Sequence, residues 1–153
     1  MTLNRLLVVL LTASGLLFGC KKEEKEEETP PAVTASDYLG EYTASAQGSS
    51  NTFIINVFSE GGTTLKFVSN WGLYVHQEDV RASFSGNSLT FVDQEFYATS
   101  IGTTGGTRRT VSGSGSRSGN SLQMALTFNT YYTPELGGGL YASQLRNISA
   151  FRN

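Results

Sequence analysis

The stretch Val80-Arg-Ala-Ser-Phe-Ser-Gly-Asn-Ser-Leu-Thr-Phe-Val92 decides the fold of this chain. Apolar and polar residues alternate on both sides of its Gly-Asn dipeptide, which is the pattern of two half-buried antiparallel strands joined by a two-residue turn. With that turn Phe84 faces Leu89, so the apolar side chains of both strands lie on one face. The stretch therefore predicts a β-hairpin with one buried side.

The same pentapeptide, Ser-Gly-Asn-Ser-Leu, occurs again at residues 118–122. A turn at this second Gly-Asn sets Gly115 opposite Met124 and Gly113 opposite Leu126. Glycines that face large side chains are typical of a tightly curved sheet or a small barrel.

A third hairpin is predicted around the Gly-Gly pair at residues 61–62. A two-residue loop there would place Lys66 opposite Val57, whereas a three-residue loop, Glu60–Gly62, keeps apolar residues on one face. The register therefore favours the longer loop.

Extending this pattern predicts an all-β domain of about eight strands, spanning residues 37–153 and rich in Gly, Ser and Thr. Eight strands in up-and-down order close a small antiparallel barrel, and a two-sheet β-sandwich is the alternative. The predicted strands are Gly40–Gln47, Thr52–Ser59, Thr63–Ser69, Asp79–Ser85, Ser88–Gln94, Phe96–Ile101, Thr107–Gly115 and Leu122–Tyr131.

The amino-terminal segment has the features of a signal peptide. Arg5 precedes the apolar run Leu6–Phe18, whose 13 residues are fewer than the roughly 20 needed to span a bilayer as a helix. The run ends in Leu17-Phe18-Gly19-Cys20, which resembles the bacterial lipobox. That resemblance implies removal of Met1–Gly19 and attachment of lipid to Cys20, and the alternative is an ordinary secretory signal or an uncleaved anchor.

A charged tether follows, so residues 20–36 are expected to link the lipid to the domain. Every residue of Lys21–Glu28 is charged, with three Lys and five Glu, and two prolines come next. Such a segment has nothing to bury and is expected to stay solvated. An acidic cluster directly after the lipidated Cys also resembles the surface-export signal of outer-membrane lipoproteins. This implies an outer-membrane protein held at the cell surface, with the periplasmic face as the alternative.

The domain also resembles a short calycin, the group of lipocalin-like barrels. In that group a Gly-x-Trp on the first strand packs against an Arg near the carboxyl end, and here Gly40-Glu41-Tyr42 and Arg146 or Arg152 occupy the corresponding regions. The resemblance implies that the barrel binds a small hydrophobic molecule. Tyr42 and Trp71 are the candidate ligand-binding residues.

Charge and cysteine content exclude other classes of function. Residues 29–153 hold eight acidic and seven basic residues, and the pI of the chain is about 5.4. A domain with no basic surface stripe is not expected to bind nucleic acid, because such binding depends on Lys and Arg. Cys20 is the single cysteine, so no intramolecular disulfide can form.

Candidate catalytic groups are few. A Ser–His–acid system would need His76, the only histidine. The possible metal ligands in His76-Gln77-Glu78-Asp79 are adjacent on a strand and point to opposite faces, which does not suit a metal site. Asp93 and Glu95 would share a face if their strand is unbroken, as paired glycosidase carboxylates do. Arg108-Arg109 could hold an anion at a barrel mouth. Exposed surface charge is the simpler interpretation of these groups, so we expect no catalytic residues, metal or cofactor.

The sequence thus predicts a membrane-anchored, non-enzymatic lipoprotein whose barrel binds a small hydrophobic or saccharide ligand. The alternative is a structural or adhesion module whose outer face binds a protein or glycan partner.

Overall fold

The structure is a computed structural model that describes residues 31–73, 77–98, 107–132 and 138–153, without the side chains of 96–98 and 107. Within it, Ala32–Asn153 form one compact unit. The predicted signal peptide, Cys20, the charged run and His76 lie outside the described residues.

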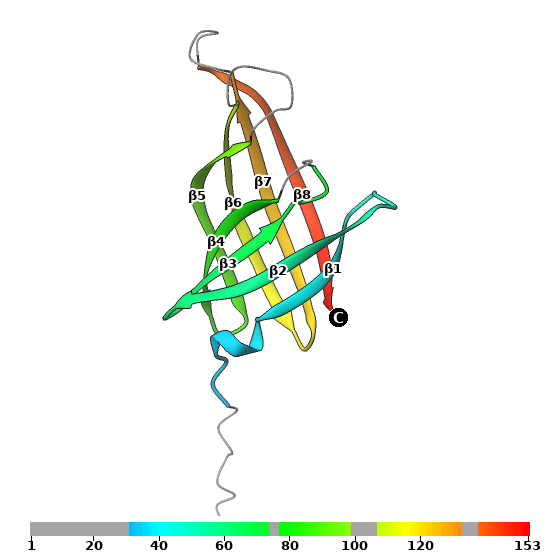
Figure 1. The fold of residues 1–153 in the computed structure, drawn as a ribbon, viewed down its shortest axis with the longest axis vertical. Coiled ribbons are helices and arrows are strands. Elements are labelled where there is room, and N and C mark those ends of the chain that lie inside the picture. The colour runs from blue at the N-terminus through cyan, green and yellow to red at the C-terminus, as the bar shows by residue number, and fades with distance from the viewer. Residues whose placement is uncertain (1–30, 74–76, 99–106, 133–137) are drawn as a thin grey trace, which may run out of the picture. The chain divides into compact units, whose positions relative to one another are not determined.

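The described unit is a closed barrel of eight antiparallel strands in sequence order, and the last strand pairs with the first (Figure 1). This confirms the all-β, up-and-down barrel and not the sandwich. A short 3₁₀ helix, η1, precedes the strands. The elements are η1 (Ala35–Asp37), β1 (Gly40–Ala46), β2 (Thr52–Gly61), β3 (Thr64–Ser69), β4 (Glu78–Ser85), β5 (Ser88–Ala98), β6 (Thr107–Ser118), β7 (Ser121–Tyr131) and β8 (Leu140–Arg152).

Both Gly-Asn hairpins form with the predicted registers. Phe84 pairs with Leu89 between β4 and β5, and Gly113 pairs with Leu126 between β6 and β7. In the first hairpin Gly86 has a φ of 53°. Asn87 does not have a positive φ, because Trp71 is the only described non-glycine residue that does. Positive φ at the first turn residue alone is the pattern of a type II′ turn, which suits the twist of a hairpin.

The β2–β3 hairpin differs from the prediction. Ser59 pairs with Leu65 and Gly61 pairs with Thr64, so the turn has two residues and the extra residue, Glu60, lies in a β-bulge. The bulge keeps Val57 and Phe67 on the same face, which is why the predicted face is correct although the predicted three-residue loop is wrong.

Two strands also differ from the predicted set. The predicted strand Ser88–Gln94 and the described part, 96–98, of the predicted strand Phe96–Ile101 belong to one strand, β5, which has a bulge between Phe91 and Gln94. The carboxyl-terminal strand β8 was not predicted. Its half near Leu140 is exposed, so its sequence lacks the apolar alternation that marks a half-buried strand.

Buried apolar side chains form one hydrophobic cluster inside the barrel. Phe67 packs on Phe91 with ring centroids 5.2 Å apart, and Tyr38 packs on Phe84 at the same separation. Each such ring contributes about 1.5–3 kcal/mol by leaving water. The cluster extends over every strand and includes Tyr42, Ile55, Leu65, Val80, Leu89, Val111, Leu122, Leu126 and Ile148.

Candidate functional site

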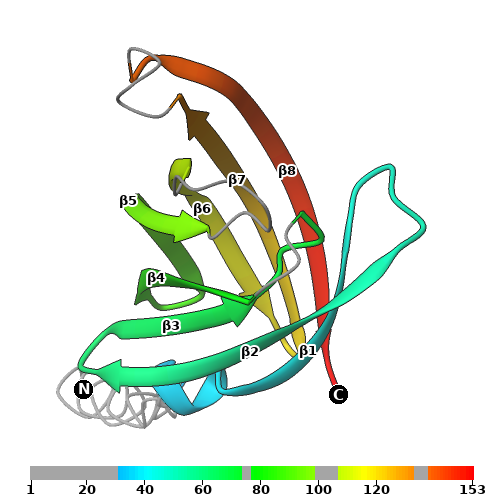
Figure 2. The same ribbon diagram turned by 45° about the horizontal axis from the view of Figure 1, so that its top comes forward.

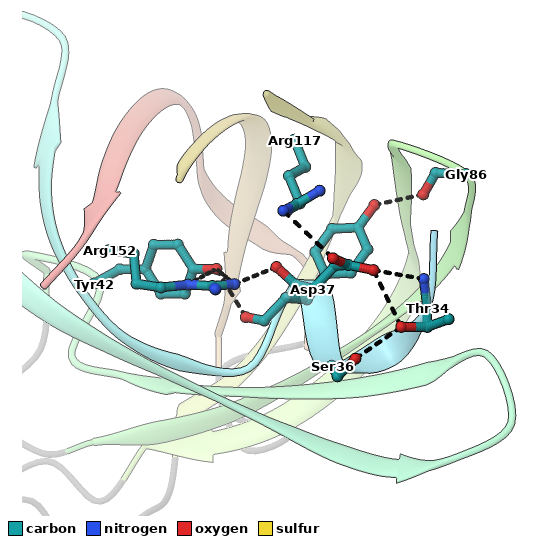
Figure 3. Close-up of polar contacts among 8 residues, drawn as sticks. Thr34, Ser36, Asp37, Tyr42, Gly86, Arg117 and Arg152 are labelled. Atoms are coloured by element: carbon teal, nitrogen blue, oxygen red, sulfur yellow. Dashed lines mark hydrogen bonds and ion pairs between the residues drawn. The ribbon is translucent and has the colours of Figure 1, made fainter. Parts of the chain in front are cut away.

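The end of the barrel that carries η1, which we call the base, is closed by side chains. Arg152, near the end of β8, donates from Nε to the Tyr42 hydroxyl at 3.2 Å and from Nη2 at 2.9 Å, and Nη2 also donates to the Asp37 carbonyl (Figure 3). Its guanidinium lies 5.4 Å from the centre of the Tyr42 ring. The Tyr42 hydroxyl in turn donates to the Tyr38 carbonyl at 2.8 Å. Arg152, and not Arg146, therefore packs against the Gly40-Glu41-Tyr42 segment.

Charge interactions hold η1 on the base. The Asp37 carboxylate accepts hydrogen bonds from the Thr34 backbone N–H at 2.8 Å and the Thr34 hydroxyl at 3.1 Å (Figure 3). These bonds, with Arg117 and Arg152 nearby, hold the pKa of Asp37 below its usual value. Burial raises the pKa of the Tyr38 phenol, whose hydroxyl donates to the Gly86 carbonyl at 2.7 Å. These polar groups of the base are thus engaged with one another, whereas Arg117 Nε is buried without a hydrogen-bond partner in the described part of the chain.

Tyr42 is completely buried in this base, and its hydroxyl is fully used there. The structure gives it a role in closing the barrel. The other predicted ligand residue, Trp71, comes two residues after the end of β3 and so lies toward the opposite end of the barrel. This end carries the β1–β2 hairpin (Figure 2), and we call it the open end.

Trp71 is held by a tight turn directly after β3. It has a φ of 55°, a conformation that is unfavourable for a bulky residue and persists only where its surroundings fix it. Its backbone N–H donates to the Ser69 hydroxyl at 3.0 Å, and its ring packs on Phe128 with centroids 5.9 Å apart. The indole is completely buried, yet Nε1 has no hydrogen-bond partner among the described residues.

Arg146 also has an unsatisfied nitrogen at this end. It lies opposite Leu126 on the inward side of β8, and its Nε is buried without a partner in the described part of the chain. No described carboxylate forms an ion pair with it. A Cβ added to Gly72 would lie 3.7 Å from Arg146 Nη1, so Arg146 reaches the turn that carries Trp71. The calycin resemblance offered Arg146 only as a partner for the Gly40-Glu41-Tyr42 segment, although its spacing from the buried Ile148 and Ala150 marks it as inward-facing.

A polar hollow of about 460 Å³ opens beside Arg146. β1 pairs with β8 only up to Ala46, and beyond that point the β1–β2 hairpin leans away from β8 (Figures 1 and 2). We call this space the β1–β8 hollow. It is lined by Ala46, Gln47, Gly48, Ser49, Asn51, Gly72, Gln144, Leu145, Arg146 and Asn147.

The acidic and basic residues that the sequence singled out lie on β5 and β6. The β5 bulge comes between Phe91 and Gln94, so the strand that carries Asp93 and Glu95 is not regular. Glu95 forms an ion pair with Arg108, whose guanidinium lies 5.0 Å from the centre of the Tyr131 ring. Arg109 lies beside Thr130 of β7, half-buried, near the open end of β6.

The described ranges contain no group of three or more His, Cys, Asp or Glu that could hold a metal ion. None of the helical segments in the described ranges has the length and apolar character needed to cross a bilayer.

The base and the open end together define the class of this domain: an eight-stranded up-and-down barrel, compatible with a lipocalin-like domain, closed by side chains at one end and hollowed beside the other. Comparison with protein-family models, curated proteins and solved structures finds no match for the chain.

Proposed function

We propose that this chain is a lipid-anchored, non-enzymatic lipoprotein whose barrel binds a small hydrophobic or saccharide ligand at its open end. The observation that carries the proposal is the pair of buried, unpartnered donors there, Trp71 Nε1 and Arg146 Nε. A buried polar group without a partner costs about 1–3 kcal/mol, and a bound ligand that accepts a hydrogen bond would recover that energy.

The hollow supports this placement. At the base, the Tyr42 hydroxyl and the Arg152 guanidinium bond to each other, and Arg117 Nε is buried there without a hydrogen-bond partner in the described part of the chain. The feature that distinguishes the open end is therefore the hollow beside Arg146. At the open end, the hollow of about 460 Å³ falls within the roughly 300–1,000 Å³ typical of small-molecule sites.

The membrane anchor rests on the sequence Leu17-Phe18-Gly19-Cys20. Acyl chains on Cys20 would each contribute about 0.8 kcal/mol per buried methylene, and two chains are enough for stable anchoring. The charged run after Cys20 supports placement on the outer surface of the outer membrane, so protease added to intact cells should remove the domain. Replacing Glu23–Glu28 with alanines should protect it, and a domain that is protected in both proteins would contradict surface display.

A second candidate function is that of a structural or adhesion module that binds a partner through its outer face. The observation that favours it is a set of exposed apolar side chains on β8, where Leu140, Tyr141 and Leu145 are more than half exposed. The last contact between β1 and β8 is the hydrogen bond from the Gln47 N–H to the Asn147 carbonyl. From there toward Leu140, β8 is not paired with β1. That half of β8 offers a sheet edge to a protein partner.

The ligand proposal is tested by native mass spectrometry of the full chain extracted in mild detergent from the cells that make it. We expect a co-purifying small molecule whose occupancy falls in Trp71→Phe, because that change keeps an aromatic ring but removes the indole N–H. Val92→Ala, on the exposed surface of β5, serves as the matched control and should keep the ligand. A wild-type protein that carries no ligand would contradict the small-molecule function and would favour the module that binds a partner through its outer face.

A further inference from the structure

We propose that the β1–β8 hollow binds a sugar that carries a carboxylate, with Arg146 as the residue that holds the acid group. The inference rests on the proposed ligand-binding function and names the class of ligand and the site.

The first step is the charge of the hollow. Among its ten lining residues one is cationic and none is acidic, so the hollow has a positive charge with no internal counter-ion. Three other described arginines lie against carboxylates: Arg81 donates to Glu60 at 2.7 Å, Arg108 pairs with Glu95, and Arg117 lies 3.7 Å from Asp37. Arg146 has no such carboxylate, which leaves its charge available to an anion.

The second step is the geometry of the guanidinium. Its Nε is buried and unpartnered, while the residue as a whole is half-buried at the edge of the hollow. A planar guanidinium binds a carboxylate through two parallel N–H bonds, and such charge-assisted bonds are roughly twice as strong as neutral ones. A carboxylate in the hollow would therefore compensate the charge of the Arg146 guanidinium.

The third step concerns the remaining lining, which suits hydroxyl groups. Four side-chain amides border the hollow, and each offers both donors and an acceptor: Gln47, Asn51, Gln144 and Asn147. Asn147 Nδ2 donates to Gln47 Oε1 at 2.9 Å, and the Gln47 N–H donates to the Asn147 carbonyl at 2.8 Å. These bonds hold two of the amides in place where β1 leaves β8, so the hollow is partly preorganised.

The fourth step is the turn that borders the hollow at Gly72. Gly72 has a φ of 62°, and a Cβ there would lie 3.0 Å from the Phe53 ring and 3.7 Å from Arg146 Nη1. Gly72 therefore lets the turn approach Arg146 closely. Because Trp71 is adjacent and is the only tryptophan, its fluorescence provides a direct signal of occupancy.

The test is a titration of the full chain in detergent with a tetragalacturonate, followed by Trp71 fluorescence and calorimetry. The methyl ester of the same tetrasaccharide is the control, because it keeps the sugar rings and removes the charge. We expect the acid to bind at least about tenfold more tightly than the ester. Equal affinity for the two, or no binding of the acid, would overturn the inference.

Variants place the binding at Arg146. Arg146→Gln should remove the preference for the acid, and Arg146→Lys should restore only part of it, because an ammonium lacks the planar fork. Arg81→Gln, which removes an arginine paired with Glu60 away from the hollow, should leave the titration unchanged. If Arg146→Gln binds the acid as wild type does, the site lies elsewhere and the assignment fails.

Inorganic phosphate is titrated in parallel. Binding of phosphate without binding of tetragalacturonate would overturn the sugar-acid assignment. The proposed function is judged separately, by the co-purifying molecule and the Trp71→Phe variant, so failure of this inference and failure of that function give different results.

Discussion

Gly113 shows how a single residue sets the curvature of this barrel. A Cβ added there would lie 2.1 Å from the Ala125 carbonyl oxygen and 3.0 Å from Leu126 Cα, both backbone atoms of β7. Gly113→Ala must therefore push β6 away from β7, and we expect it to lower the free energy of unfolding by about 1–3 kcal/mol. Urea denaturation of Gly113→Ala beside Gly139→Ala, whose added Cβ meets nothing within 4 Å, checks this. Equal stability of the two variants would contradict the prediction.

Asp37 should make the stability of the base depend on pH. The pKa of Asp37 is lowered in the folded protein, chiefly by the hydrogen bond from the Thr34 N–H. The ionised carboxylate therefore stabilises the folded state at pH values above its ordinary pKa of about 3.9, and this stabilisation is lost as the pH falls through the lower pKa of the folded protein. Asp37→Asn should therefore be less stable than wild type at neutral pH, and the difference should shrink below about pH 4. Urea denaturation at a series of pH values measures this, with the exposed Asp93→Asn as control. A difference that grows on acidification would refute the assignment.

The sequence predicts some of these residue roles and not others. The packing of Tyr42 against a carboxyl-terminal arginine follows from the calycin resemblance, but the choice of Arg152 over Arg146 depends on the β1–β8 register, which the sequence does not reveal. The ligand-binding role of Trp71 stays a prediction. Its left-handed backbone and unpartnered Nε1 depend on tertiary packing against Phe128, which no local pattern shows.

Among the elements, β4 and β5 are joined by a side chain where their backbones separate. Away from the turn, the backbone pairing of the two strands ends at Ser83 and Thr90. The Gln94 amide accepts from the Arg81 N–H at 2.7 Å and donates to the Arg81 carbonyl at 2.6 Å. Gln94 thus takes the place of a missing strand partner beside the β5 bulge.

Gln94→Ala should weaken this junction without changing the core. We expect a loss of about 1 kcal/mol in the free energy of unfolding and faster hydrogen exchange of the Arg81 amide, which loses its acceptor. Asp93→Ala, one residue away in the same bulge, is the matched control. Unchanged exchange at Arg81 would show that the Gln94 contact does not protect the strand.

The success of prediction at the level of elements follows local chemistry. Gly-Asn turns fix hairpin registers over short distances, so β4–β5 and β6–β7 could be aligned from the sequence. Bulges insert single residues that only the three-dimensional sheet specifies. This is why the β2–β3 turn was predicted with the wrong length and why β5 was predicted as two strands. The inward positions Gln144 and Arg146 are polar because they border the hollow, so β8 lacked the apolar pattern by which strands are recognised.

At the scale of the whole molecule, location and folding stability should be separable. The barrel unit Ala32–Asn153 does not include Cys20, and its core draws on strands from Gly40 onward. Loss of Cys20 should therefore leave the packing of the barrel intact, whatever the thiol carries.

Cys20→Ala should abolish palmitate labelling and release the protein from the membrane, while the urea midpoint of the barrel stays unchanged. The physical reason is that the acyl chains supply the membrane affinity and the barrel core supplies the folding free energy, so the two do not share residues. Metabolic labelling, membrane fractionation and denaturation of the same variant measure the three quantities together, with Ala32→Ser in the amino-terminal part of the unit as a control that keeps the thiol. Labelling that persists in Cys20→Ala would defeat the anchor assignment, and a lowered urea midpoint would show that the lipidated end contributes to the fold.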